Sequence, residues 1–306
     1  FDLIICSDML NLPVFKSVAN IKKNNSKVVM YFHENQFSYP WSPNDPDIKL
    51  NRDLHYGYIN YTSSLVSDYN FFNSNYHLTQ YINDLEKYLN KMPDYNNKNT
   101  IKLIKEKSSV LYIGCDLENN FKFKKNKMTK PVLLWNHRWE YDKNPELFFN
   151  TLFEIDKMNI DFRLIVIGEN YTNYPSIFDT ARKKLSNKII HFGYVESREK
   201  YLELLNIANI LPVTSNQDFF GISIIEAISA CNYPLLPNKL TYPELVNNKI
   251  FFYDNEKQFI KSLLEVMNKF NTHNYEVEKL SNKIIKKYDW KSISDIYDKT
   301  FLKLLN

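Results

Sequence analysis

Short apolar runs rich in β-branched and aromatic residues alternate along this chain with longer segments whose apolar residues recur at helical spacing. The runs predict strands at 2–6, 27–33, 69–73, 109–113, 131–136, 162–168, 188–192, 208–213, 233–236 and 250–253. Helical spacing predicts helices at 52–68, 75–91, 145–158, 175–186, 197–206 and 221–231, and a helical C-terminal stretch at 255–306. This alternation indicates an α/β fold, in which helices cover both faces of parallel sheets.

The length and one loss of periodicity predict two domains. A chain of 306 residues is long enough for two domains of ordinary size. Periodicity vanishes near 116–130, in a lysine-rich stretch, and a new strand begins at Pro131. We therefore expect Rossmann-like, doubly wound domains at 1–120 and 121–288 that face each other across a cleft. The last helix, 289–306, should pack back on the first domain.

Composition excludes several classes of protein. Hydrophobic residues make up 44% of the chain and charged residues 24%, which favours a globular core over disorder. No apolar run approaches the ~18 residues that cross a bilayer. The three cysteines, Cys6, Cys115 and Cys231, show neither disulfide nor zinc spacing, which predicts a reducing, cytoplasmic setting. The chain opens inside a strand without an initiating Met, so we expect a preceding segment to be missing.

Net charge is compatible with a polyanionic partner but does not identify one. The formal value is +4 at pH 7. The lysine-rich stretch between the domains has two interpretations, a solvated linker or a contact with a phosphate backbone.

The loops that follow predicted strands are where parallel-sheet proteins bind ligands. One such loop runs from Asp218 to Glu226 and opens a helix, with two acids eight residues apart. Gly221 allows the backbone to approach a ligand closely, and the amides at Phe220, Gly221 and Ile222 would face an anion. The alternative is an ordinary helix start, with Asp218 as a capping acid and Glu226 on the solvated face.

Two further loops carry polar residues in equivalent positions. After strand 131–136, Arg138 and Lys143 could together grip a diphosphate, although Arg138 could instead pair with an acid of the same loop. After strand 27–33 comes the run His33-Glu34-Asn35-Gln36. A histidine in that place can hydrogen-bond a sugar hydroxyl or assist proton transfer.

A competing motif is Asp45-Pro46-Asp47, which has the Asp-x-Asp pattern of a divalent-metal site. It lies in a turn-rich stretch, whereas such a motif should end a buried strand. We therefore predict no metal.

The three loops together resemble retaining family-four glycosyltransferases of the GT-B fold, over nearly the whole chain. The resemblance implies that Asp218 binds the hydroxyls of the donor sugar and Glu226 those of the ribose. It further implies that Arg138 and Lys143 neutralise the leaving diphosphate, that His33 faces the sugar, and that Tyr194 and Val195 contact the base. The usual first acid of that motif is Glu, so the shorter Asp218 is a departure.

Other strings resemble one branch of these enzymes, the tRNA-queuosine mannosyltransferase family. They are Tyr31-Phe32-His33-Glu34-Asn35-Gln36, Tyr56-Gly57-Tyr58, Phe72-Asn73-Ser74, His137-Arg138-Trp139-Glu140 with Asp142-Lys143, Phe219-Phe220-Gly221, Cys231-Asn232-Tyr233-Pro234-Leu235 and Tyr242-Pro243-Glu244. This resemblance implies transfer of mannose from GDP-mannose to queuosine in tRNA, with no prosthetic group.

Acceptor contacts are expected in the first domain, from Glu34, Asn35, Gln36, Tyr39, Tyr56 and Tyr58, with Trp41 as a further stacking ring. The aromatic rings could stack on an anticodon base, or they could be core. Two other functions stay open from the sequence. One is the same chemistry on a glycan or lipid acceptor, and the other is a non-catalytic RNA-binding relic of the fold.

Overall fold

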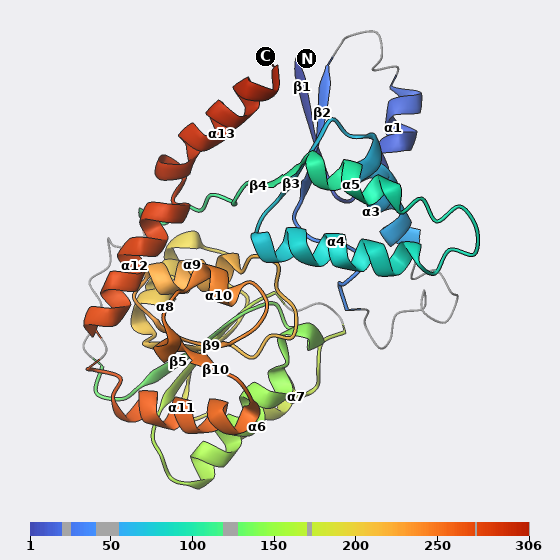
Figure 1. Cartoon of the computed structure of the whole chain (residues 1–306). Coiled ribbons are helices and arrows are strands. Elements are labelled where there is room, and N and C mark those ends of the chain that lie inside the picture. The colour runs from blue at the N-terminus through green and yellow to red at the C-terminus, as the bar shows by residue number, and fades with distance from the viewer. Residues whose placement is uncertain (20–25, 41–54, 119–127, 170–172, 273, 306) are drawn as a thin grey trace. The chain divides into compact units, whose positions relative to one another are not determined.

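A computed structural model describes the chain except residues 20–25, 41–54, 119–127, 170–172, 273 and 306 (Figure 1). It contains all ten predicted strands, with ends shifted by a few residues. The chain forms two compact units. Unit 1 comprises Phe1–Ile113 and Ile293–Asn306, and unit 2 comprises Gly114–Ser292. The chain passes from unit 1 to unit 2 after Ile113, seven residues before the boundary predicted after residue 120.

Unit 1 is built on a four-stranded parallel sheet in the order β1-β2-β3-β4. Its strands are β1 (Leu3–Ser7), β2 (Lys27–Phe32), β3 (Tyr69–Phe72) and β4 (Ser108–Val110). Its helices are α1 (Leu12–Val18), α3 (His55–Val66), α4 (Asn75–Leu89), α5 (Asn99–Glu106) and most of α13 (Trp290–Leu305).

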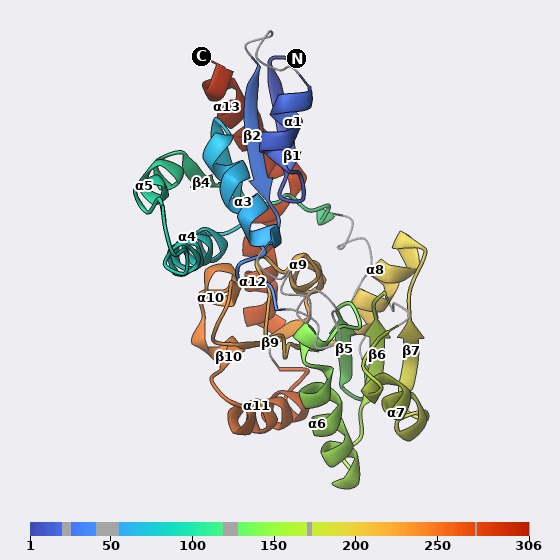
Figure 2. The ribbon, with the colours of Figure 1, turned by 90° about the vertical axis from the view of Figure 1, so that its right-hand side faces the viewer.

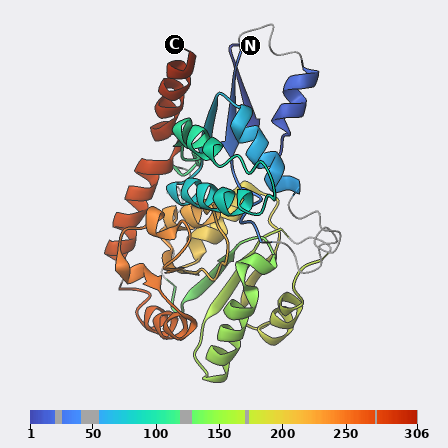
Figure 3. The same cartoon turned by 45° about the vertical axis from the view of Figure 1, so that its right-hand side comes forward.

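Successive residues of β2 point to opposite faces of this sheet, and helices cover both. Val28 and Met30 belong to a core cluster with side chains of α1, α3, α4 and α5. Val29 belongs to a second cluster, which Leu304 of α13 completes. The Tyr297 hydroxyl of α13 donates to the carbonyl of Tyr112 at 2.8 Å. The final helix therefore packs on the sheet of unit 1 (Figure 3).

Unit 2 contains a six-stranded parallel sheet in the order β10-β9-β8-β5-β6-β7 (Figure 2). Its strands are β5 (Val132–Asn136), β6 (Arg163–Ile167), β7 (Ile189–Gly193), β8 (Ile210–Pro212), β9 (Tyr233–Pro237) and β10 (Phe252–Tyr253). Its α-helices are α6 (Pro145–Lys157), α7 (Ile177–Lys184), α8 (Arg198–Ile207), α9 (Ile222–Ser229), α10 (Tyr242–Leu245), α11 (Glu256–Asn268) and α12 (Asn274–Tyr288). The described part of unit 2 also contains the short 3₁₀ turns η3 (Tyr141–Lys143) and η4 (Lys249–Phe251).

The strand order of unit 2 locates its ligand-binding edge. From β5 the chain winds outward through β6 to β7, and it then returns to place β8 on the other side of β5. This reversal between β5 and β8 is the topological switch point of a doubly wound sheet, where ligands bind beyond the carboxyl ends of the strands. The loops carrying Arg138, Lys143 and Asp218 follow these two strands.

The helices that sequence periodicity did not predict are short. Helix α1 has seven residues, and its Val14 and Val18 are exposed. Two local features start this helix. Asn11 caps it, because its Oδ1 accepts from the Val14 amide at 3.3 Å, and Pro13 lies in the first turn. Capping, rather than an apolar stripe, therefore defines this element.

The three cysteines, Cys6, Cys115 and Cys231, are free. Burial raises the pKa of the Cys115 thiol to about 12, so this side chain is an inert part of the core. Across the described residues, every helix is too short or too polar to cross a membrane.

Candidate functional site

The loop that follows β5 is held in place by its own large side chains. Trp135, fully buried in β5, donates through Nε1 to the carbonyl of His137 at 3.0 Å. Trp139 stacks on Phe178 of α7 with ring centroids 4.3 Å apart. A Cβ at Gly168 would come within 1.9 Å of the His137 carbonyl oxygen, so only glycine fits there. The packing of Trp135, Trp139 and Gly168 thus fixes the backbone of the loop that carries Arg138 and Lys143.

Lys143 is largely buried, with 11% of its side chain exposed, and its charge is balanced. Its Nζ lies 3.0 Å from Oδ2 of Asp142 and donates to the carbonyl of Gln217 at 2.8 Å. Burial by itself would lower the pKa of Lys143, but the carboxylates of Asp218 and Asp142 raise it above its ordinary value. The ammonium group is therefore permanently charged beside the acidic loop.

Arg138 is half-exposed and pairs with Glu140 at 3.2 Å, which is the alternative that the sequence left open. Burial raises the pKa of Glu140, while the Arg138 guanidinium opposes that rise. A pair of this kind on one loop is weak in water. Arg138 is thus a half-exposed cation on the loop after β5, where an anionic ligand can compete with Glu140 for it.

The acidic loop leads from β8 into α9. Asp218 is half-buried, and its Oδ2 accepts a hydrogen bond at 3.0 Å from the hydroxyl of Tyr242. Burial, followed by the nearby Asp218 carboxylate, raises the pKa of Tyr242 well above its usual range, so the hydroxyl stays protonated. Gly221 has a φ of +85°, the left-handed conformation that lets the chain turn into α9. Phe220 is buried, whereas Ile222 at the helix start is exposed.

Glu226 lies on α9 and is not on a solvated face, because only 13% of its side chain is exposed. Its Oε1 lies 2.6 Å from Nη1 of Arg198, and its Oε2 accepts from the Tyr201 hydroxyl at 2.7 Å. Asn136, the last residue of β5, donates to Tyr201 Oη at 2.9 Å and to the carbonyl of Ser223 at 2.9 Å. This network connects the carboxyl end of β5 to α8 and α9.

Sequence reasoning missed the partners in this network. Arg198 and Tyr201 stand 28 and 25 residues before Glu226 and lie on another helix. Tyr242 is likewise 24 residues from Asp218. The signal that could have found the two tyrosines is weak, since tyrosine is common throughout this chain.

Tyr194 and Val195 follow β7, which lies two strands away from β5. Tyr194 is exposed and Val195 is half-buried. Ser197 then caps α8 by accepting from the Lys200 amide at 3.3 Å. The same loop therefore carries the two residues expected near the base and begins α8, whose Arg198 and Tyr201 contact Glu226.

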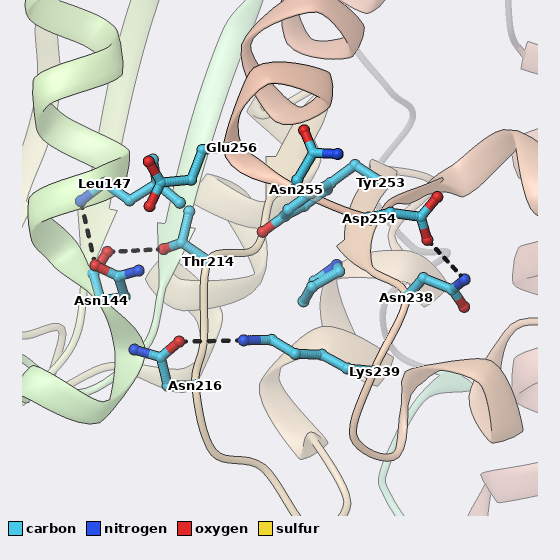
Figure 4. Close-up of a pocket in the computed structure, with 11 residues that line it drawn as sticks. Asn144, Leu147, Thr214, Asn216, Asn238, Lys239, Tyr253, Asp254, Asn255 and Glu256 are labelled. Atoms are coloured by element: carbon cyan, nitrogen blue, oxygen red, sulfur yellow. Dashed lines mark hydrogen bonds between the residues drawn. The ribbon is translucent and has the colours of Figure 1, made fainter.

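A polar cavity of about 170 Å³ lies beneath the two site loops, among the ends of β8, β9 and β10 and the starts of α6 and α11 (Figure 4). Lys239 Nζ donates to Asn216 Oδ1 at 3.1 Å on one side of it. The Thr214 hydroxyl, hydrogen-bonded at 2.9 Å to the Lys143 carbonyl, lines it too. None of the predicted site residues lines this cavity.

In unit 1, the polar run after β2 divides into exposed and buried members. His33 has 57% of its side chain exposed. Gln36 and Glu34 are half-buried and hydrogen-bond each other at 2.9 Å. Asn35 is fully buried, and its Oδ1 accepts from the backbone amides of Phe37 and Ser38. Asn35 therefore holds the turn, and its side chain is not accessible to an acceptor.

Of the aromatic residues expected near the acceptor, Tyr56 and Tyr58 are exposed on α3, whereas Tyr39 is half-buried. Trp41 and the Asp45-Pro46-Asp47 motif lie outside the described residues. Within the described part of the chain, His, Cys, Asp and Glu side chains form no group of three or more that could hold a metal ion.

Comparison with known proteins places the chain in a family. Residues 116–287 match the family of group 1 glycosyl transferases, and residues 1–115 match the N-terminal family of tRNA-queuosine alpha-mannosyltransferases. The chain therefore belongs to the group 1 glycosyltransferases, and its N-terminal part resembles that of the tRNA-queuosine alpha-mannosyltransferases.

One relative resembles the chain in sequence, and solved structures share its fold. The tRNA-queuosine alpha-mannosyltransferase of Drosophila melanogaster is 35% identical over 227 residues, which are 71% of this chain and 58% of that protein. The fold matches a glycosyltransferase of Rickettsia africae (TM-score 0.69, 16% identity, 100% of this chain and 77% of the other). It also matches sucrose-phosphate synthase of Thermosynechococcus elongatus (TM-score 0.73, 12% identity, 99% and 74%). The two parallel-sheet units thus form a GT-B fold.

The buried histidine of the site loop predicts how stability depends on pH. Burial, assisted by the charge of Lys143, lowers the pKa of His137 to about 3, from about 6.5 in an unfolded chain. Between these values only the unfolded state binds this proton, so stability falls as pH falls. His137→Gln should flatten that dependence by up to ~1.4 kcal/mol per pH unit. Urea unfolding of the wild type and the variant at several pH values between 7 and 4 measures the slope of unfolding free energy against pH.

The exposed His55 provides the control. His55→Gln should leave the slope of unfolding free energy against pH almost unchanged, because this substitution removes no buried imidazole. Identical slopes for the wild type and His137→Gln would contradict the burial of a neutral imidazole in the site loop.

Proposed function

We propose that this chain is a retaining glycosyltransferase that transfers a hexose from a nucleotide-sugar donor without a metal ion. The observation that carries the proposal is the grouping of Lys143, Asp218 and Glu226 beyond the carboxyl ends of β5 and β8 in unit 2. That edge contains the switch point of the sheet, and it combines a buried cation with carboxylates held by tyrosine hydroxyls. Cations suit a diphosphate, and carboxylates suit hydroxyl groups.

Each residue has a role in this proposal. Arg138, Lys143 and the amides at 220–222 bind the diphosphate at the start of α9, where the helix dipole favours an anion. Asp218 binds hydroxyls of the sugar, and Glu226 binds those of the ribose. Tyr194 and Val195 contact the base. A crystal structure of Anabaena HepE, which shares this fold at 13% identity, contains UDP.

The chemistry rests on electrostatic stabilisation of the leaving group. The bond between the anomeric carbon and the diphosphate oxygen breaks first, and its electron pair stays on the diphosphate. The acceptor hydroxyl then bonds to the oxocarbenium-like carbon on the same face, and its proton passes to the departing phosphate. Arg138, Lys143 and the α9 amides stabilise the developing charge, which is the largest catalytic contribution expected of the protein.

For the particular substrates, we propose GDP-mannose as donor and queuosine in tRNA as acceptor, in the cytoplasm. The support is the match of residues 1–115 to the queuosine family and the name of the Drosophila relative, of which this chain spans 58%. His33 faces the sugar in this proposal. The exposed rings of Tyr56 and Tyr58 offer surfaces on which a base can stack. Glu34, Gln36 and Tyr39 belong to the loop after β2, which contacts the same helix because the Gln36 amide donates to Asn60 Oδ1 at 2.8 Å.

The donor site is tested by removing its cations. Arg138→Ala and Lys143→Ala should each weaken GDP binding by ~1–3 kcal/mol, because each removes a charge-assisted hydrogen bond. Titration calorimetry on purified protein, with circular dichroism to check folding, measures the effect. Lys200→Ala is the control, since this exposed lysine of α8 forms a surface salt bridge with neighbouring Glu203.

Two outcomes would contradict the donor assignment. GDP affinity equal to that of the wild type in both variants would exclude the diphosphate role. A strict requirement for Mn²⁺ or Mg²⁺, shown by loss of donor binding or of glycosyl transfer with a chelator, would contradict the metal-free proposal and favour Asp45 and Asp47 as metal ligands.

Binding of tRNA should depend steeply on salt, because contacts with phosphates release condensed counterions. Donor binding should depend on salt much less, because Lys143 is shielded from solvent. Filter-binding titrations of queuosine-modified tRNA and calorimetry of GDP-mannose, each at 50 and 200 mM salt, compare the two. Equal sensitivity of both ligands would contradict a phosphate-backbone interface.

The acceptor is tested by transfer from GDP-mannose to queuosine-modified and unmodified aspartate tRNA, with the mass gain on tRNA as readout. We expect mannose on the modified tRNA alone. Equal transfer to both tRNAs, or transfer only to a glycan or lipid, would overturn the acceptor and retain the glycosyltransferase. Binding of tRNA with no transfer from any nucleotide sugar would instead identify a non-catalytic RNA-binding protein.

A further inference from the structure

A buried carboxylate in unit 1 has no place in the function described so far. Asp8 follows β1, and only 3% of the residue is exposed. Its Oδ1 accepts the backbone N–H of His33 at 3.0 Å and lies 3.4 Å from Nδ1 of the same residue. Asn60 of α3 donates to the Asp8 carbonyl at 2.9 Å, which anchors the loop that carries this carboxylate.

The other end of the His33 peptide is anchored as firmly. Asn73, which follows β3, donates through Nδ2 to the His33 carbonyl at 2.7 Å. Its Oδ1 lies 2.8 Å from Nδ1 of the buried His77. Because Asn73 uses its amide nitrogen on a carbonyl, its Oδ1 is an acceptor and His77 Nδ1 must be the donor. This network, Asp8–His33–Asn73–His77, links the carboxyl ends of β1, β2 and β3.

The network also determines the state of the His33 ring. A carboxylate oxygen only accepts hydrogen bonds, so a neutral imidazole facing Asp8 through Nδ1 carries its proton there. Nε2 is then the atom with a lone pair, on a side chain with 57% exposure. Such a nitrogen accepts a hydrogen bond from a hydroxyl group, whereas it cannot donate one to a phosphate or carbonyl oxygen.

We propose that Asp8 is a positioning residue that holds neutral His33 as its Nδ1–H tautomer and so presents Nε2 as an acceptor for a sugar hydroxyl. The identity of that hydroxyl as part of the donor rests on the proposed function, but the tautomer does not. Asn73 and His77 complete the arrangement by fixing the backbone on the other side. Within the Phe72-Asn73-Ser74 string, Asn73 therefore has the structural role of holding the His33 backbone.

The tautomer is measured directly by two-bond ¹H–¹⁵N correlation spectra of the full chain at a pH where His33 is neutral, with His33→Gln used to assign the signals. In the wild type, His33 should show a pyridine-like Nε2 and a protonated Nδ1. Asp8→Ala should shift the population toward Nε2–H. Asp8→Asn should restore Nδ1–H, because its Oδ1 still accepts both N–H groups of His33.

His77 is the internal control in the same spectra. Its Nδ1–H state depends on Asn73 and should be identical in all the variants, which also reports that the fold of unit 1 is intact. A wild-type His33 that carries its proton on Nε2, or a tautomer unchanged in Asp8→Ala, would overturn the proposal. Neither result would bear on whether the chain is a glycosyltransferase.

Transfer kinetics provide the second readout. Asp8→Ala should lower kcat by less than the ~10²–10⁴-fold typical of losing a catalytic imidazole, with GDP affinity unchanged. Asp8→Asn should recover most of the rate. A weaker GDP affinity in Asp8→Ala with normal kcat would contradict a role exerted through His33, since the nucleotide is assigned to unit 2.

Discussion

The contacts of the buried Lys143 ammonium group determine how the loops after β5 and β8 of unit 2 are arranged. A lone buried charge is unstable, and this one is tolerated because Asp142, Asp218 and the Gln217 carbonyl surround it. The same contacts join the loop after β5 to the loop after β8. Backbone bonds reinforce them, since the Asn216 amide donates to the Asp142 carbonyl at 2.7 Å. The cation that neutralises a diphosphate in our proposal thus also holds the two site loops together.

The two units position their polar residues by different means. In unit 2, aromatic packing around Trp135 and Trp139 fixes the loop, and tyrosine hydroxyls then orient the two acids. In unit 1, backbone groups of the loop after β2 are held by hydrogen bonds with the short amide side chains of Asn35, Asn60 and Asn73. Buried amides of this kind are costly unless paired, so a network that pairs them rigidifies the residue it surrounds.

Prediction from sequence succeeded where the signal was local. The ten strands and the long helices follow from apolar periodicity, and the positions of Arg138, Lys143 and Asp218 follow from the rule that ligands bind beyond strand ends. Short elements such as α1 carry too little periodicity to be seen. Glu226 was correctly placed on α9, but its partners Arg198 and Tyr201 come from α8 through contacts that no local pattern encodes.

The amino-acid sequence by itself determined the α/β class, the two-unit organisation and the polar loops that follow the strands, because these depend on period and on neighbours along the chain. Tertiary structure alone decided which charges are buried, which partners they have and which side chains are accessible. It placed Asn35 inside the turn, paired Arg138 with Glu140 and brought Asp8 to His33. The physical reason is that pKa values, tautomers and hydrogen-bond partners depend on atoms that meet across strand ends, whatever their separation in sequence.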